Sequence, residues 1–93
     1  MFDRVLRRMQ ALVRASEYVV TLHGHEETEA DRLTMYDVEH VILTERIVER
    51  QRDERTNEWK YLVGGETLEG DAAVVAGKIG PTRKVVVLTV YLL

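Results

Sequence analysis

Several common ingredients are missing from this sequence, and each absence removes a class of function. The 93 residues contain no cysteine, which excludes disulfide bonds, thiol nucleophiles and cysteine-ligated zinc. Ser16 is the only serine, so a serine-based acyl-transfer site is set aside. No apolar run approaches the ~20 residues that cross a bilayer, and the first residues lack the apolar stretch of a signal peptide. We therefore expect a cytoplasmic protein without a membrane partner.

The composition that remains is that of a globular domain. Hydrophobic residues make up 45% of the chain and charged residues 31%, which suits one slim core rather than a disordered chain. The net charge of −3 is unevenly spread, because residues 21–45 carry seven acids against Arg32 alone. The other segments are neutral to slightly basic and can still present a cationic face. We expect a single domain over residues 1–93.

Hydrophobic periodicity predicts helices first and strands afterwards. Residues 2–14 and 33–43 show the three–four apolar spacing of amphipathic helices, and Thr34 with Asp37 resembles a capping box. Between them, a β-branched run predicts a short strand that ends at His23, followed by a polar helix or loop. Residues 46–92 contain four extended segments separated by turns, which predicts an antiparallel meander. This order indicates an α+β fold.

The segment TLHGHEE, residues 21–27, is the most chemically loaded part of the chain. His23 and His25 on a strand can chelate a metal, with a carboxylate from Glu26 or Glu27, but the spacing fixes no third ligand, so we expect no metal site. A histidine exchanges protons near neutral pH, which makes His23 the candidate general acid or base. The alternative is a structural junction in which the imidazole binds backbone carbonyls.

The strands supply further candidates through their alternation. In residues 58–64, Trp59 and Tyr61 are predicted to face the core, which leaves Lys60 on the open side of the sheet. In the last strand, alternation places Thr89 and Tyr91 on the same side as Val85 and Val87. Gly64 and Gly65 suggest a bulge or bend, and Gly70 a hairpin turn.

The first long strand carries most of the arginines. Strict alternation places Arg46, Val48, Arg50 and Arg52 on one face. A sheet face with arginines, a lysine and a tyrosine can hold phosphates and stabilise a phosphorane. The alternative is a solvated edge with Arg–Glu pairs across strands.

Long stretches of the chain resemble a known family. They are TLHGHEETEADRLTMYDVEHVILTERIVERQRD, then EWKYLVGGETLEGD, the residues Pro81, Thr82 and Lys84, and the final LTVY. Together they are similar to the bacterial domain-of-unknown-function family 4258, from about Tyr18 to Tyr91. Members are commonly encoded beside a YgiT-type zinc-finger antitoxin. They are grouped with the RelE- and MqsR-like toxins, which are small α+β ribonucleases that cut messenger RNA.

This resemblance implies helices packed on one face of a curved antiparallel sheet of about four strands, with RNA on the other face. It implies a metal-independent endoribonuclease that needs no cofactor, in which His23 does acid–base work, Lys60 binds phosphate charge, and Tyr91 stacks on a base or transfers a proton. The expected RNA-binding residues are Arg46, Arg50, Arg52, Arg83 and Lys84. Glu45 stands where relatives typically have glycine, which predicts a different turn into the following strand.

Expected partners are RNA, a zinc-finger antitoxin and a second copy bound through the helix at residues 2–14. A second hypothesis is a non-catalytic interaction module that uses the sheet or this helix to bind a protein. A third is a metal-binding regulator that uses His23 and His25.

Overall fold

The computed structural model describes residues 2–44 and 46–93, which form three helices and five strands. In chain order these are α1 (Asp3–Arg14), β1 (Tyr18–Val20), α2 (Leu22–Ala30), α3 (Met35–Thr44), β2 (Arg46–Arg52), β3 (Trp59–Glu66), β4 (Ala72–Ile79) and β5 (Val85–Leu92). The predicted α+β class is confirmed. The two predicted amphipathic helices correspond to α1 and α3, with ends shifted by one or two residues.

The five strands form one mixed sheet in the order β1-β5-β4-β3-β2. Neighbours from β2 to β5 are antiparallel, as the predicted meander requires. The resemblance implied an antiparallel sheet of about four strands, whereas the sheet has five strands and is mixed. The short strand that the sequence predicted before His23 is β1, and it joins the sheet by pairing in parallel with β5, Tyr18 opposite Val85. β5 therefore has a neighbour on each side, which explains why it is apolar on both faces.

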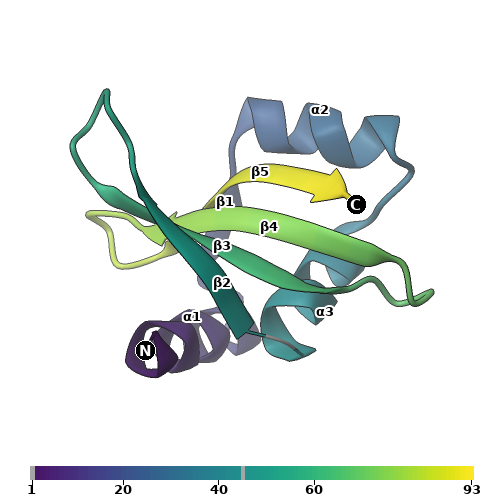
Figure 1. Ribbon diagram of the computed structural model, residues 1–93, viewed down its shortest axis with the longest axis horizontal. Helices are drawn as coiled ribbons and strands as arrows, with labels where there is room; N and C mark the ends of the chain where they lie inside the picture. Colours follow the sequence, from purple (N-terminus) through teal and green to yellow (C-terminus); the bar gives the residue numbers. More distant parts are fainter. Residues whose placement is uncertain (1, 45) are drawn as a thin grey trace.

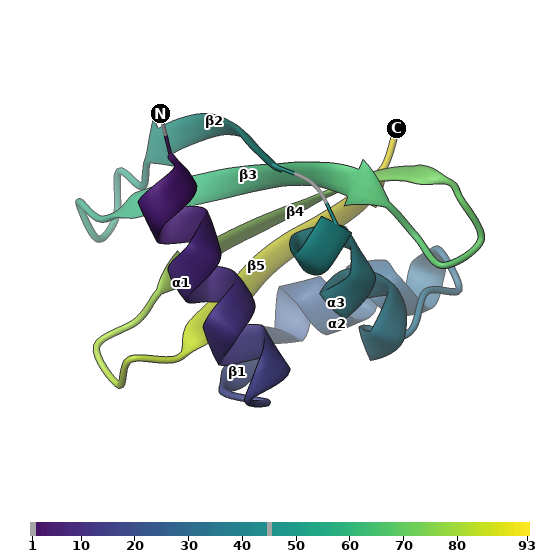
Figure 2. The same ribbon diagram turned by 90° about the horizontal axis from the view of Figure 1, so that it is seen from below.

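The helices α1 and α3 lie side by side on one face of the sheet, as both views show (Figures 1 and 2). Met9 of α1 and Ile42 of α3 are almost completely buried, and they join a single apolar cluster with Val75 and Val85 of the sheet. The predicted apolar stripe of α1 thus faces inward, because burial of that stripe is what stabilises a short helix.

The helix α2 takes a different position, along the outer edge of β5 (Figure 1). The Thr21 hydroxyl caps it by accepting a hydrogen bond from the N–H of Gly24 at 3.1 Å, and donates to the carbonyl of Leu88 at 3.2 Å. The Glu27 carboxylate accepts from the N–H of Val90 at 3.0 Å. These bonds satisfy backbone groups of β5 beyond the point where β1 ends, so α2 covers an edge that would otherwise be open.

A β-bulge at Val48 changes the facing of the arginines on β2. Ile47 faces the core, and the register shift after it brings Arg50 to the same side. Arg52 follows Arg50, whereas Arg46 and Val48 remain on the opposite side. The prediction that Arg46, Val48, Arg50 and Arg52 share one face is therefore wrong, because strict alternation fails where one strand holds an extra residue.

A second bulge, at Leu88, has the same effect on β5. The register moves by one residue, so Val90 joins Val87 in the core. Thr89 and Tyr91 consequently face away from α1 and α3. The predicted grouping of Thr89 and Tyr91 with Val87 is wrong, because the bulge places Tyr91 on the open side of the sheet while Val87 faces the core.

Two local predictions, the capping box at Thr34 and the turn at Gly70, are confirmed. The N–H of Asp37 donates to the Thr34 hydroxyl at 3.3 Å, and the N–H of Thr34 donates to the Asp37 carboxylate at 2.9 Å, which completes the capping box. Gly70 has φ of 89°, a turn conformation that glycine adopts without strain. Glu45 lies outside the described residues. Within those residues, no helix is long and apolar enough to cross a membrane.

Candidate functional site

The open face is the side of the sheet turned away from α1 and α3, and it carries Arg46, Lys60 and Tyr91. Tyr91 pairs with Val74, which pairs with Gly64, which pairs with Arg46, so one row across the sheet joins Tyr91 to Arg46. Lys60 lies on β3 four residues from Gly64, which is roughly 13 Å along the strand. The predicted placement of Lys60 and Tyr91 on one face is confirmed.

His23 lies in the first turn of α2 rather than at a strand end, because β1 stops at Val20. Its Nε2 is 3.4 Å from Oε1 of Glu27, one helical turn away, and the imidazole is exposed. The same Glu27 oxygen accepts the N–H of Val90, the residue before Tyr91. The sequence had suggested Glu27 only as a metal ligand, whereas here its carboxylate lies beside the imidazole of His23 at the edge of β5.

The three predicted catalytic side chains do not converge on one point. His23 and Tyr91 are both tied to β5, but Lys60 is two strands away, roughly 10 Å across the sheet and roughly 13 Å along it from the row of Tyr91. One phosphate therefore cannot contact all three groups. A strand of several nucleotides laid across the open face can.

The histidines are not arranged to share a metal ion. Residues i and i+2 of a helix point to different sides, so His23 and His25 cannot chelate together from α2. The Nδ1 of His40 lies 2.8 Å from the carbonyl oxygen of Glu66, a structural bond between α3 and β3. Among residues 2–44 and 46–93, no three or more His, Asp or Glu side chains are grouped closely enough to hold a metal.

A family model for the domain of unknown function DUF4258 matches residues 20–92. The chain belongs to this family. No curated protein and no solved structure matches it. The family description gives no activity, so any function rests on the residues and their geometry. The match begins in β1 and leaves out α1, although α1 contributes to the core.

In this DUF4258 domain, Arg50 and Arg52 form a separate cluster with Trp59 on the helix side of the sheet. Their guanidinium carbons lie 3.9 and 4.2 Å from the centroid of the Trp59 ring. Arg50 also lies 5.6 Å from the ring of Phe2, which packs edge-on against Tyr61 at 6.0 Å. The structure therefore separates these two arginines from Arg46, Lys60 and Tyr91.

The remaining predicted RNA-binding residues lie in the turn between β4 and β5. Arg83 is exposed, and Nζ of Lys84 is 3.8 Å from a carboxylate oxygen of Glu17. Because Val85 pairs with Ile79, this turn lies at the end of the sheet where β3 begins. The turn is thus near the Lys60 end of the open face and remote from Tyr91.

Sequence reasoning missed Lys78, which lies beside Lys60 on the open face. Its Nζ donates to Glu58 at 3.0 Å. The hydrogen bond from the N–H of Arg55 is the main cause that holds the pKa of Asp53 below its ordinary value, and Lys60 and Lys78 add to the effect. Strict alternation along β4 was the available signal for Lys78.

Proposed function

We propose that this protein is a metal-independent endoribonuclease, the toxin of a bacterial toxin–antitoxin pair, which cuts messenger RNA on the open face of the sheet. The observation that carries the proposal is the His23–Glu27 pair, held to the backbone of β5 beside Tyr91. Its proposed protein partner is a zinc-finger antitoxin, and its proposed location is the cytoplasm.

The reaction needs a base, an acid and positive charge near the phosphate. The base removes the proton of a ribose 2′-OH, whose oxygen attacks the adjacent phosphorus, and the acid protonates the departing 5′ oxygen. His23 does one of these proton transfers, and Glu27 holds its imidazole in place. Tyr91, 36% exposed, stacks on a base or takes part in the second transfer.

The lysines contribute binding rather than chemistry. Lys60 and Lys78 lie two and one strands from β5, so they suit phosphates that flank the cleaved bond. Arg46, in the row of Tyr91, extends the cationic surface to the other edge of the sheet. This division of roles follows from the roughly 10 Å that separate β3 from β5.

Expression of the protein in a bacterium, with growth and messenger RNA integrity as readouts, tests the proposal. Wild-type protein should arrest growth and cleave RNA, and His23→Ala should lower the cleavage rate roughly 100-fold or more. His25→Ala is the matched control, since His25 lies on another side of α2 and should leave cleavage intact. Equal cleavage by folded His23→Ala and wild-type proteins would remove His23 from the site.

Lys60→Ala separates binding from chemistry. We expect the KM for an oligoribonucleotide to rise several-fold with kcat nearly unchanged, because Lys60 contacts a flanking phosphate. Arg14→Ala, at the far end of α1, removes the same charge and should leave both constants unchanged. A fall in kcat as large as that of His23→Ala would instead place Lys60 at the reacting phosphate.

The second function, a non-catalytic interaction module, is favoured by one feature, the uncovered edge of β2. The apolar side of α1 does not favour it, because Leu6, Met9 and Val13 are buried in the core. A homodimer through α1 would have to use the arginine-rich outer side of that helix.

A further inference from the structure

The two edges of the sheet differ in whether other elements cover them. At the β5 side, α2 supplies Thr21 and Glu27 to the backbone groups that β1 leaves unpaired. At the other side, β2 is the last strand. Among the described residues, no hydrogen bond reaches the β2 backbone from outside the sheet. An uncovered edge of seven residues is a template for a further strand.

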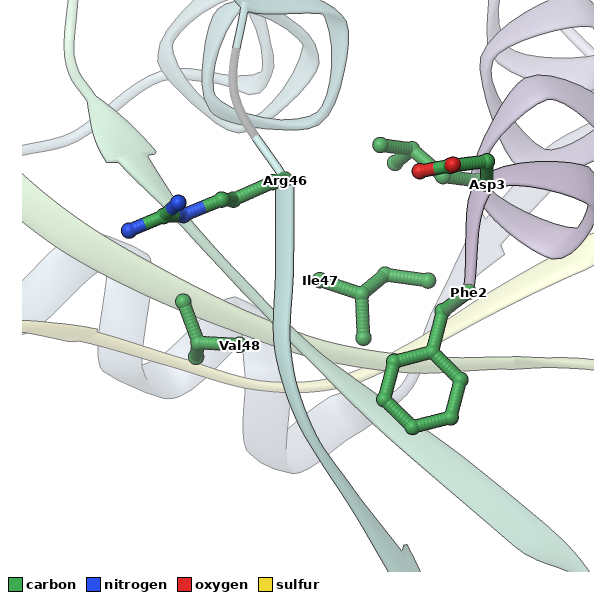
Figure 3. Close-up of a pocket in the computed structure, with 6 residues that line it drawn as sticks. Phe2, Asp3, Arg46, Ile47 and Val48 are labelled. Carbon is green, nitrogen blue, oxygen red and sulfur yellow. The ribbon is translucent and has the colours of Figure 1, made fainter.

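A groove of about 440 Å³ runs beside this edge, between β2 and the start of α1 (Figure 3). Ile47 points into it toward Phe2 and Asp3, whereas Arg46 and Val48 point to the other side of the strand. Leu6 completes the apolar lining on the α1 side. A strand added to β2 would place alternate side chains in this groove and the others beside Arg46 and Val48.

The charge around the groove is mainly positive. Arg46 is one of the lining residues, although its side chain points to the other side of β2, and Arg50 lies over the ring of Phe2, another lining residue. An adjoining hollow, lined by Asp3, Leu6 and Arg7, brings a third arginine to the α1 side. The opposing acids are Asp3 and Glu49, so three arginines face two carboxylates at this edge.

We propose that the free edge of β2 binds an extended acidic peptide of a protein partner, which adds a sixth strand to the sheet. Its backbone pairs with β2, one or two apolar side chains enter the groove between Phe2 and Ile47, and the carboxylates on its other face meet Arg46, while Arg50 adds positive charge beside the groove. Strand addition supplies affinity through the backbone, and the pockets and charges supply selectivity. The peptide surface shares Arg46 with the open face, but strand addition at β2 does not depend on catalysis, so the proposal stands whether or not the protein cleaves RNA.

A second copy of the chain suits this edge poorly. β2 contains three arginines and one glutamate, so pairing two β2 strands would bring six arginines together with only two glutamates. Like charges opposite one another destabilise a strand pair. The bulge at Val48 further bends the strand out of the straight form that self-pairing needs. The same charges attract an acidic strand.

RNA also suits this edge less well than a peptide. The groove floor is built from Phe2, Leu6 and Ile47, with Asp3 on its rim, and it offers little to a phosphate chain. The strand edge presents alternating N–H and C=O groups, which another peptide backbone matches and a sugar–phosphate backbone does not.

The test uses the full chain and two synthetic nine-residue peptides in which valine alternates with either glutamate or lysine. Binding is followed by fluorescence anisotropy of the labelled peptides, and amide hydrogen exchange is measured on the protein. We expect the glutamate peptide to bind at least roughly tenfold more tightly than the lysine peptide, with an affinity that falls as salt rises. The amides of β2 should gain protection when the glutamate peptide is bound.

The variant Arg46→Glu/Arg50→Glu should reverse this preference, so that the lysine peptide binds more tightly. Arg14→Glu/Arg83→Glu changes the net charge equally at sites away from the groove and should keep the wild-type preference. Circular dichroism of both variants checks that the fold is retained.

Three results would overturn the proposal. One is equal binding of the two peptides, and another is protection that appears on a surface other than β2. The third is occupation of the same edge by another molecule, seen as protection of the β2 amides by RNA alone or as β2 protection that rises with protein concentration alone.

Discussion

At the residue scale, Asp37 joins the start of α3 to the turn between β3 and β4. Its carboxylate accepts the N–H of Thr34 at 2.9 Å and the N–H of Leu68 at 3.1 Å. The bond from Thr34 is the main cause that holds the pKa of Asp37 below its ordinary value, against a smaller rise from burial. The ionised carboxylate therefore stabilises the folded state near neutral pH, and this contribution is lost as pH falls through the folded pKa.

We expect Asp37→Ala to lower the free energy of unfolding by about 1–2 kcal/mol near neutral pH, because a cap and a loop bond are both lost. The difference from wild type should shrink at about pH 2. Urea unfolding at both pH values measures it, with Asp31→Ala, at an exposed acid, as the control. A difference that is unchanged at acid pH would contradict the role of the charge.

The surroundings of Tyr18 predict a change in folding stability at alkaline pH. Burial, together with the hydrogen bond that its hydroxyl donates to Glu39, raises its pKa from 10.0 to about 12. The contribution of the neutral phenol to stability is thus complete below about pH 10 and is lost as pH rises through about 12.

Urea unfolding across this range should therefore show a steeper loss of stability for wild type than for Tyr18→Phe. Tyr36→Phe, at a 71% exposed tyrosine, should behave like wild type. Parallel curves for wild type and Tyr18→Phe would contradict the assignment.

The side of the sheet to which a single side chain points could be predicted only up to the first bulge in its strand. Lys60 and Tyr61 obey simple alternation, since β3 is regular along that stretch. Arg50 does not, because the extra residue at Val48 has no sequence signature in a period-two pattern. Gly64, where the sequence predicts a bulge or bend, lies against this extra residue, since an added Cβ at Gly64 would lie 3.2 Å from Cγ1 of Val48.

At the element scale, α2 depends on its bonds to β5 more than on an apolar stripe. We expect Thr21→Val, which keeps the side-chain shape but removes the hydroxyl, to cost about 1–2 kcal/mol, because bonds to Gly24 and Leu88 are both lost. Hydrogen exchange should speed up within α2 before it does in α3. Thr44→Val, which removes only an exposed bond to the carbonyl of His40, is the matched control.

The kind of contact that stabilises each element explains which elements could be predicted from the sequence. The helices α1 and α3 bury regular apolar stripes, and the meander strands are separated by turn residues, so local patterns identify them. The helix at Leu22–Ala30 is polar almost all round, and its partners on β5 are more than sixty residues away in sequence. No local pattern specifies such a contact, and the same distance hid the pairing of β1. The position of His23 depends on where β1 ends and α2 begins, so the sequence did not predict it.

At the scale of the whole molecule, the DUF4258 match and the folding unit differ in extent. The match covers residues 20–92, yet Met9 of α1 is fully buried in the core. We expect a fragment of residues 15–93 to lack cooperative thermal unfolding by circular dichroism. Met9→Ala in the full chain should cost about 2–5 kcal/mol. Met35→Ala, at a half-buried methionine of α3, should cost less, and an independently folding fragment would contradict the expectation.

The pairing of Tyr18 with Val85 also sets the order of events during folding. The ladder between β1 and β5 forms only after a loop of most of the chain has closed, which is entropically slow. Until β1 pairs with it, β5 has an unpaired edge. Refolding should therefore take milliseconds to seconds, as in other folds rich in non-local contacts. A chain still awaiting its last strand would be a natural client for chaperones.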